Sequence, residues 1–243
     1  MKVLAVTMSV RDYKPCEYWR NQIDFVDKIE YKNFWHMEAH SRSKKFFLEH
    51  DYTHYLFLAE DIIVLPEHVK LILKDAEENS FKVVAGYCNI DYIDGGKANI
   101  SFTDLRRFRV YSRSQYNHPS LYDVLTGKYG YPFFNATFQG NCLTLIERSV
   151  VEQLSFKPYM YRMDYDSRNR FMCNMPFGIM FDLQMCNELL NLGVPITVDV
   201  RLFTPHFAFG LGVINLKGKS RTIKFFDSKN GVWKLLEELP PYG

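Results

Sequence analysis

The sequence predicts an α/β protein in which helices flank a mixed, mainly parallel β-sheet. Short apolar runs such as KVLAVTMSV, THYLFLA and FKVVAGY alternate with longer stretches of helical character. Strands that alternate with helices form βαβ units, whose parallel strands are buried on both faces. The chain of 243 residues is 47% apolar and has no Pro/Gly/Ser-rich linker, so we expect a single domain over residues 1–243.

The individual elements follow from the apolar runs and from the residues that begin and end helices. Pro15 and Pro66 stand where helices would begin, because proline is tolerated in the first helical turn. Gly193 stands where a glycine commonly ends a helix. We expect strands over residues 2–10, 29–34, 53–59, 81–87 and 194–200, helices over residues 13–26, 36–50, 66–79 and 180–193, and a strand, a glycine, a further strand and a helix within residues 135–154.

Three regions do not follow this alternation. Residues 87–133 are rich in Tyr, Asp, Gly and Arg and predict an irregular or hairpin-containing segment over one end of the sheet. Residues 157–178 predict a long loop, and long loops inside compact domains are often functional lids. The tail from Lys217 contains a basic cluster and then a short amphipathic segment, GVWKLLEELPP.

Composition and charge exclude several classes of protein. The formal net charge is +2 with acids and bases interleaved, which argues against a nucleic-acid-binding protein driven by a basic field. The five cysteines are scattered and form no CxxC motif, so we expect reduced thiols rather than disulfides or a zinc site. No apolar run approaches the ~20 residues that span a bilayer, and the N-terminus does not resemble a signal peptide. We therefore expect a cytoplasmic protein without a transmembrane segment.

An acidic pair, Glu60 and Asp61, directly follows the apolar run THYLFLA. In open α/β sheets, ligands bind at the carboxyl ends of the strands. Hard carboxylate oxygens at that edge suit Mg²⁺ or Mn²⁺, which in turn binds a diphosphate. The alternative interpretation is a solvated turn, whose acids cap the helix that begins near Pro66.

Together with its neighbours, this pair resembles the DxD region of the GT-A glycosyltransferases, in particular their family 2-like branch. The matching stretches are YTHYLFLAEDIIVLPEHVKLIL and KVVAGY. On this resemblance AED takes the place of DxD, with Ala59 in place of the first acid and Asp61 at the metal-binding position. The same resemblance implies a GT-A-like, Rossmann-related sheet.

A second stretch, FDLQMCNELLNLGVPITVD followed by TPHF, resembles the acceptor-side signature of the same family. The resemblance implies that Asp182 is the catalytic base and that His206 binds the metal or the diphosphate. Phe181 stands where the family usually has Glu. The alternative interpretation of Asp182 is a helix N-cap.

The resemblance also implies an activity. It is the transfer, with inversion, of a sugar from a UDP- or GDP-linked donor to a hydroxyl of a glycan, a protein or a small molecule, with Mg²⁺ or Mn²⁺. The donor-binding half would span about residues 1–95, the acceptor-side half about residues 130–212, and the C-terminal tail residues 213–243. The implied metal ligands are Glu60, Asp61 and His206, the donor-binding residues Ser9, Val10, Arg11, Arg42, Lys217 and Lys219, and the acceptor-side residues Gly140, Tyr161 and Asp164. For Arg42 the alternative is a solvated charge on its helix.

Two other functions stay open. One is a metal-dependent nucleotidyltransferase, against which the sequence has no Gly-rich GGxGxR loop near its first strand. The other is a nucleotide-sugar-binding protein with impaired catalysis, because Ala59 and Phe181 are apolar where the family has acids. The pair His36 and His40 lacks the HExxH spacing of a zinc protease, and we expect both to be surface histidines on a helix.

Overall fold

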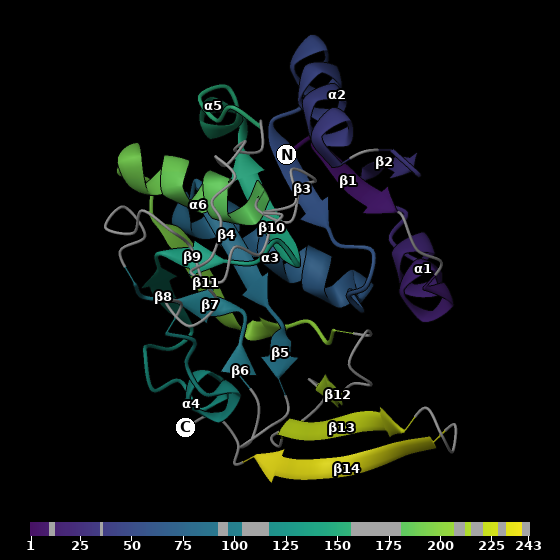
Figure 1. Cartoon of the computed structure of the whole chain (residues 1–243), viewed down its shortest axis with the longest axis vertical. Helices are drawn as coiled ribbons and strands as arrows, with labels where there is room; N and C mark the ends of the chain where they lie inside the picture. Colours follow the sequence, from purple (N-terminus) through teal and green to yellow (C-terminus); the bar gives the residue numbers. More distant parts are fainter. Residues whose placement is uncertain are drawn as a thin grey trace, which may run out of the picture.

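A computed structural model of the chain describes residues 1–9, 13–34, 36–91, 97–103, 117–156, 181–206, 212–214, 221–227 and 232–239. Over these residues the fold is α/β, and its main element is a seven-stranded sheet with the order β2-β1-β3-β10-β4-β11-β8 (Figure 1). Its strands are β1 (Val3–Ser9), β2 (Asp27–Lys32), β3 (His54–Leu58), β4 (Val83–Tyr87), β8 (Phe133–Ala136), β10 (Leu143–Glu147) and β11 (Ile196–Phe203). The helices are α1 (Lys14–Asn21), α2 (His36–Glu49), α3 (Pro66–Asn79), α4 (Leu121–Leu125), α5 (Arg148–Val151) and α6 (Phe181–Asn191).

The strand directions confirm the predicted mixed, mainly parallel sheet. Strands β2, β1 and β3 are parallel to one another, and β4 is parallel to β11. Strand β10 runs antiparallel to both β3 and β4, and β8 runs antiparallel to β11. The carboxyl ends of β1, β3, β4 and β11 therefore lie at one edge of the sheet, together with the amino end of β10.

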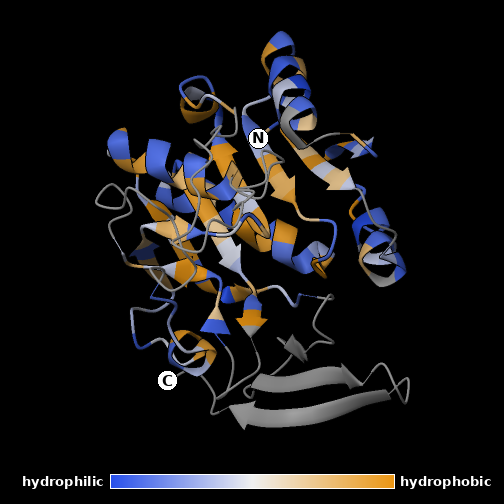
Figure 2. Ribbon diagram, in the orientation of Figure 1, coloured by the Kyte–Doolittle hydropathy of each residue, from blue (hydrophilic) through white to orange (hydrophobic). Residues whose placement is uncertain are grey.

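Alternate residues of the central strands enter two separate apolar layers. Leu4 and Val6 of β1 belong to the layer on the side of α2 and α6, whereas Val3 and Ala5 belong to the layer on the side of α3. This alternation is the two-residue period of a strand that is covered on both faces. The strands in the centre are accordingly mostly hydrophobic, and the helices around them combine hydrophobic and hydrophilic residues (Figure 2). No helix of the described ranges is both long and apolar enough to cross a bilayer.

Helix α3 spans the predicted residues 66–79, and its ends show why. Pro66 opens the helix after Leu65, and the backbone N–H of Leu65 donates to Nδ1 of His68 at 3.3 Å. Burial lowers the pKa of His68 to about 4, which keeps the imidazole neutral and able to accept this bond. At the other end Ser80 adopts a left-handed conformation with φ 54°. The helix begins after Leu65, so the acids at positions 60 and 61 do not cap it.

The shorter strands lie outside the main sheet. Strands β5 (Asn89–Asp91) and β6 (Lys97–Ala98) form a hairpin, and β7 (Ile100–Ser101) pairs with β9 (Phe138–Gln139). For the tail, the sequence indicates only an amphipathic stretch. The structure shows a three-stranded antiparallel sheet of β12 (Gly212–Ile214), β13 (Arg221–Asp227) and β14 (Val232–Leu239), which is drawn at the bottom of Figure 1.

A buried charge cluster connects α3 to β11. The Arg201 guanidinium donates to both carboxylate oxygens of Asp75, at 2.7 and 2.8 Å, and to both of Asp199, at 2.8 and 2.9 Å. Asp75 and Asp199 are both buried. Burial raises the pKa of Asp199, against the opposing effect of Arg201. Arg201 therefore compensates two carboxylates that water does not reach.

Arg201→Met tests this compensation. We expect the free energy of unfolding to fall by about 3–5 kcal/mol at pH 8, because two buried carboxylates lose their cation. At pH 5 the loss should be smaller, since a carboxyl whose pKa is raised takes up a proton in the folded state. Denaturant unfolding at both pH values measures this difference. Lys74→Met, which removes an exposed ion pair with Glu78, is the control and should change little. Equal losses at the two pH values would contradict the interpretation.

Candidate functional site

Two chain segments that follow strand ends are joined by backbone hydrogen bonds at the carboxyl edge of the sheet. Ile62, after β3, forms an isolated antiparallel bridge with His206, after β11. The Ile63 N–H donates to the Pro205 carbonyl at 2.9 Å. This pairing brings together Asp61 and His206, and Oδ2 of Asp61 lies 3.0 Å from Nε2 of His206. The sequence predicted both residues for one site, and the structure places them in contact.

The end of β4 holds the His206 segment from the other side. The Tyr87 carbonyl accepts hydrogen bonds from the backbone N–H of Thr204 at 2.8 Å and from its hydroxyl at 3.1 Å. Asn89 Oδ1 accepts the backbone N–H of His206 at 3.3 Å. The position of His206 therefore depends on Tyr87, the last residue of the buried strand VVAGY, and on Asn89, two residues further on.

The acidic turn is supported from α1 by a residue that the sequence analysis did not single out. Arg20 is buried, and its Nη1 donates to the backbone carbonyl of Glu60 at 2.8 Å. Glu60 is itself buried, with 5% of its surface exposed. Cys16, one helical turn before Arg20, is fully buried as well. A helical spacing of four residues between Cys16 and Arg20 was the available signal that this face of α1 points inward.

The residues present fit a metal ion only in part. In the described ranges no group of three or more His, Cys, Asp or Glu side chains is arranged to hold a metal ion. Asp61 and His206 form a pair, with one hard carboxylate oxygen and one imidazole nitrogen. Mg²⁺ commonly takes one or two protein ligands and completes its shell with water and substrate phosphates. Metal binding by Glu60, Asp61 and His206 therefore stays a prediction, for a site that a bound diphosphate would have to complete.

Asp182 lies in the first turn of α6 and has two different surroundings. Its Oδ1 accepts the backbone N–H of the adjacent residue, Leu183, at 2.8 Å, whereas an N-cap side chain bonds the N–H two or three residues further on. Its Oδ2 faces Gly140, where an added Cβ would lie 3.5 Å from this oxygen. Burial raises the pKa of Asp182 to about 6, so the group is mostly ionised at pH 7 and close to the range of an effective general base. The hydrogen bond from Leu183 and a chemical role are compatible here, because they use different oxygens.

The expectation that His40 is a surface histidine is wrong. His40 is buried in α2, and its ring stacks on the ring of Phe181 with centroids 3.3 Å apart. Phe181 also contacts the rings of Phe57 and Phe156. Phe181, which stands where the resemblance to GT-A glycosyltransferases would place an acid, thus belongs to an aromatic core. His40, Ser43 and Phe47 recur at helical spacing and are all buried, and this was the signal that the sequence contained.

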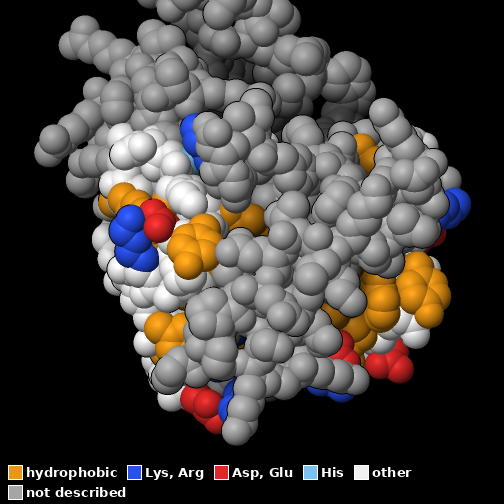
Figure 3. All heavy atoms as spheres, turned by 90° about the horizontal axis from the view of Figure 1, so that it is seen from below, with side chains coloured by type: hydrophobic (Ala, Val, Ile, Leu, Met, Phe, Trp, Pro, Cys, Tyr) orange, Lys and Arg blue, Asp and Glu red, His pale blue; other side chains and the backbone are white. Residues whose placement is uncertain are grey.

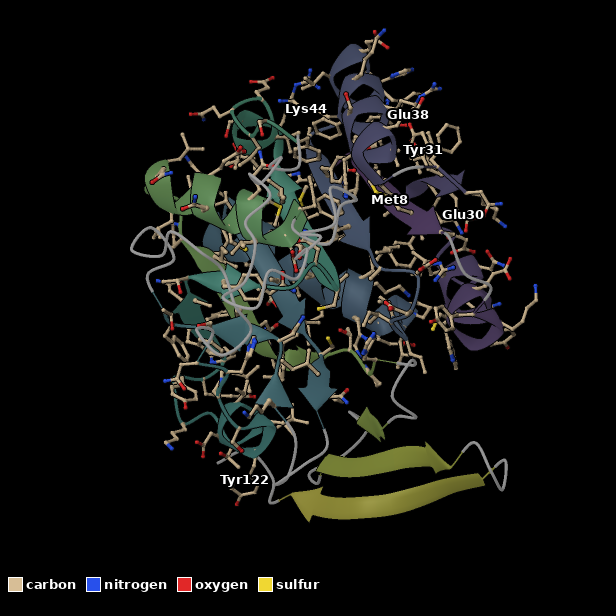
Figure 4. The ribbon with its side chains drawn as sticks, viewed as in Figure 1. Met8, Glu30, Tyr31, Glu38, Lys44 and Tyr122 are labelled. Atoms are coloured by element: carbon tan, nitrogen blue, oxygen red, sulfur yellow. The ribbon has the colours of Figure 1, made fainter. Side chains whose placement is uncertain are left out.

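The predicted donor-binding residues near β1 are only partly described. Ser9 ends β1, and its hydroxyl donates to Oε1 of Glu30 at 2.5 Å. Arg42 is exposed, donates to Glu38 at 2.8 Å and lies over the ring of Phe34. Figure 4 shows Glu38, Tyr31 and Met8 around this part of α2 and β1. The geometry of Arg42 matches the alternative of a solvated helix charge, and its role in donor binding stays a prediction.

Six predicted site residues lie outside the described residues: Val10, Arg11, Tyr161, Asp164, Lys217 and Lys219. The loop 157–178 falls outside them too. Figure 3 shows the molecule from below. On the visible described part of that face, basic and acidic side chains are scattered rather than gathered into a patch of one sign.

Asp182→Asn tests the raised pKa without any substrate. A carboxyl with a pKa near 6 when folded and about 3.9 when unfolded stabilises the fold at low pH and loses that stability as pH rises through 6. Relative to the wild type, the variant should therefore gain stability between pH 4 and pH 7, by up to about 3 kcal/mol. Unfolding curves at several pH values measure the gain.

Asp51→Asn provides the control for this measurement. Its side chain is exposed, and a hydrogen bond from Lys2 lowers the pKa of Asp51. Its substitution should therefore not stabilise the protein as pH rises. A pH-independent difference between Asp182→Asn and the wild type would contradict burial of Asp182.

Comparisons with known proteins give only distant similarities. No family model and no curated protein matches the sequence. Among solved structures, the chain is similar to A197 from STIV, with a TM-score of 0.43 and 13% identity over 99% of this chain and 96% of that one. For a CMP:2-keto-3-deoxy-manno-octonic acid synthetase with CTP, the TM-score is 0.43 and the identity is 11%, over 84% of this chain and 90% of that one. For apo UDP-glucose pyrophosphorylase, the TM-score is 0.38 and the identity is 8%, over 82% of this chain and 72% of that one. The fold assignment therefore rests on the seven-stranded sheet itself.

Proposed function

We propose that this chain is a transferase that acts on nucleotide-activated sugars, and that it moves the sugar to an acceptor hydroxyl with Asp182 as the base. The observation that carries the proposal is the placement of Asp182 at the same sheet edge as the Asp61–His206 pair. Asp182 faces Gly140, and Cys142, two residues further on, accepts the Ala59 N–H at 3.1 Å. Ala59 in turn lies two residues before Asp61.

Each half of this edge has a distinct chemical use. Asp61 and His206 would hold the diphosphate side, and a bound Mg²⁺ or Mn²⁺ would neutralise charge on the leaving group. Asp182 Oδ2 would take the proton from an acceptor hydroxyl as it attacks the anomeric carbon. Gly140 has no side chain, which lets its backbone lie close to that oxygen. The partly buried setting of Asp182 limits competing water.

Nucleotidyl transfer is the second candidate. The pair of ligands Asp61 and His206 would suit the phosphates of a nucleoside triphosphate as well as those of a nucleotide sugar. CMP:2-keto-3-deoxy-manno-octonic acid synthetase and UDP-glucose pyrophosphorylase are named for such reactions, which makes their substrates the right comparison in an assay. In this case Asp61 and His206 would keep their role, and Asp182 would contact the sugar phosphate instead of an acceptor hydroxyl.

A panel of UDP- and GDP-sugars, with and without Mn²⁺, tests the proposal. We expect at least one nucleotide sugar to raise the melting temperature in the presence of Mn²⁺ and to be hydrolysed slowly. Asp61→Asn should remove the Mn²⁺-dependent stabilisation. Asp182→Asn should retain it and lose about 10²–10⁴-fold in turnover, the usual contribution of a general base. Asp51→Asn, on an exposed surface carboxylate, should behave as the wild type.

Three results would contradict glycosyl transfer in different ways. Release of pyrophosphate from CTP or UTP with a sugar phosphate, without hydrolysis of nucleotide sugars, would establish nucleotidyl transfer. Stabilisation without turnover of any kind would indicate a binding protein. Unchanged turnover in Asp182→Asn would show that another group is the base.

A further inference from the structure

Asn99, which lies between β6 and β7, has both ends of its side-chain amide bonded to backbone groups. Its side chain is buried, with 5% of the residue exposed. Nδ2 donates to the Gly140 carbonyl at 2.7 Å, and Oδ1 accepts the Cys88 N–H at 2.8 Å. The Asn99 backbone bonds the same two residues. Its N–H donates to the Cys88 carbonyl, and its carbonyl accepts the Gly140 N–H, both at 2.9 Å. One residue thus makes four hydrogen bonds to two segments.

Those two segments carry the two halves of the candidate site. Cys88 immediately precedes Asn89, whose Oδ1 accepts the His206 N–H. Gly140 lies against Asp182, and a Cβ built on it would be 3.5 Å from Asp182 Oδ2 and 3.1 Å from Asn99 Nδ2. Asn99 is therefore placed between the strand end that holds His206 and the backbone that covers Asp182.

The chemistry of the amide explains why asparagine suits this position. The side chain offers a donor and an acceptor at a fixed separation, and both partners are backbone groups. Aspartate lacks the donor for the Gly140 carbonyl, and an apolar side chain would leave the Cys88 N–H and that carbonyl unsatisfied. A buried backbone group without a partner costs about 1–3 kcal/mol.

We propose that Asn99 is a positioning residue, which holds Gly140 against Asp182 and couples that contact to the strand end that carries His206. Gly140, the Leu183 N–H and Cys186 lie near Asp182, and none of these three is a charged side chain. Burial is the largest cause of the raised pKa of Asp182, and the Gly140 segment is one of the described parts of the chain that contribute to it. The catalytic consequence rests on the proposed function, whereas the positioning itself does not.

The test measures the surroundings of Asp182 directly and uses no substrate. Unfolding curves are measured from pH 4 to pH 8 for two pairs of proteins. The first pair is the wild type and Asp182→Asn, and the second is Asn99→Ala and the double variant Asn99→Ala/Asp182→Asn. Within each pair, the difference in the free energy of unfolding changes with pH as Asp182 loses its proton, and we call this change the Asp182 step. In the wild-type background we expect the step near pH 6. In the Asn99→Ala background it should move at least about one pH unit toward the ordinary value near 3.9, because water reaches the carboxyl.

Thr137→Val is the matched control. The Thr137 hydroxyl donates to the carbonyls of Ser101 at 2.9 Å and Thr103 at 2.7 Å, beside the same β7–β9 pair but without contact to Asp182. It should lower stability and leave the Asp182 step in place. If Asn99→Ala does not fold, Asn99→Ser retains one hydrogen bond and should shift the step in the same direction. A step at the wild-type pH in the folded Asn99 variant would overturn the proposal.

Turnover separates this proposal from the proposed function. If nucleotide sugars are turned over, Asn99→Ala should lower kcat by more than it raises the donor KM, and the acidic limb of the pH profile should move to lower pH. A shift of the stability step without any turnover would support the positioning role and reject the transferase. An unmoved step with normal transferase activity would reject the positioning role alone.

Discussion

The insertion of β10 between β3 and β4 determines where the candidate site lies. β10 runs antiparallel to both neighbours, so its amino end lies at their carboxyl ends. The Ala59 N–H donates to the Cys142 carbonyl just beyond the regular pairing. The segment before β10, with Gly140, is thereby brought to the edge where parallel strands end. With β10 in a parallel orientation, Gly140 would lie at the opposite edge of the sheet, far from Asp61 and His206.

Several buried groups at this edge are held by hydrogen bonds that involve backbone atoms. Arg20 donates to the Glu60 carbonyl, Asn89 accepts from the His206 N–H, and Asn99 joins Cys88 to Gly140. Bonds of this kind fix the loops that carry the acidic side chains. They also make the edge costly to rearrange, because each lost bond leaves a buried group without a partner.

Local sequence signals were sufficient for the elements and for the residues at strand ends. Helix α3 matches its predicted bounds because proline at its start acts locally, and β3 and β4 match because continuous apolar runs are buried on both faces. The contact between Asp61 and His206 was anticipated from the family resemblance. Asn99 could not be found in this way, because its role depends on residues 11 and 41 positions away. Nothing in the local pattern distinguishes it from any other loop asparagine.

Packing favours an apolar side chain at position 59, where the resemblance to GT-A glycosyltransferases would place an acid. Ala59 packs against the apolar layer that contains Leu58, Ile62 and Leu143. A carboxylate at position 59 would be placed against this layer, where charge is costly without a partner. Glu60, the next residue, has its carbonyl held by Arg20 and is itself buried. Asp61 is thus the acid of this turn that contacts His206. In the described ranges no group of three or more His, Cys, Asp or Glu side chains could hold a metal ion, so we expect a bound phosphate to contribute to any metal site. On this argument, affinity for a divalent cation should depend on the nucleotide, and the two should bind together.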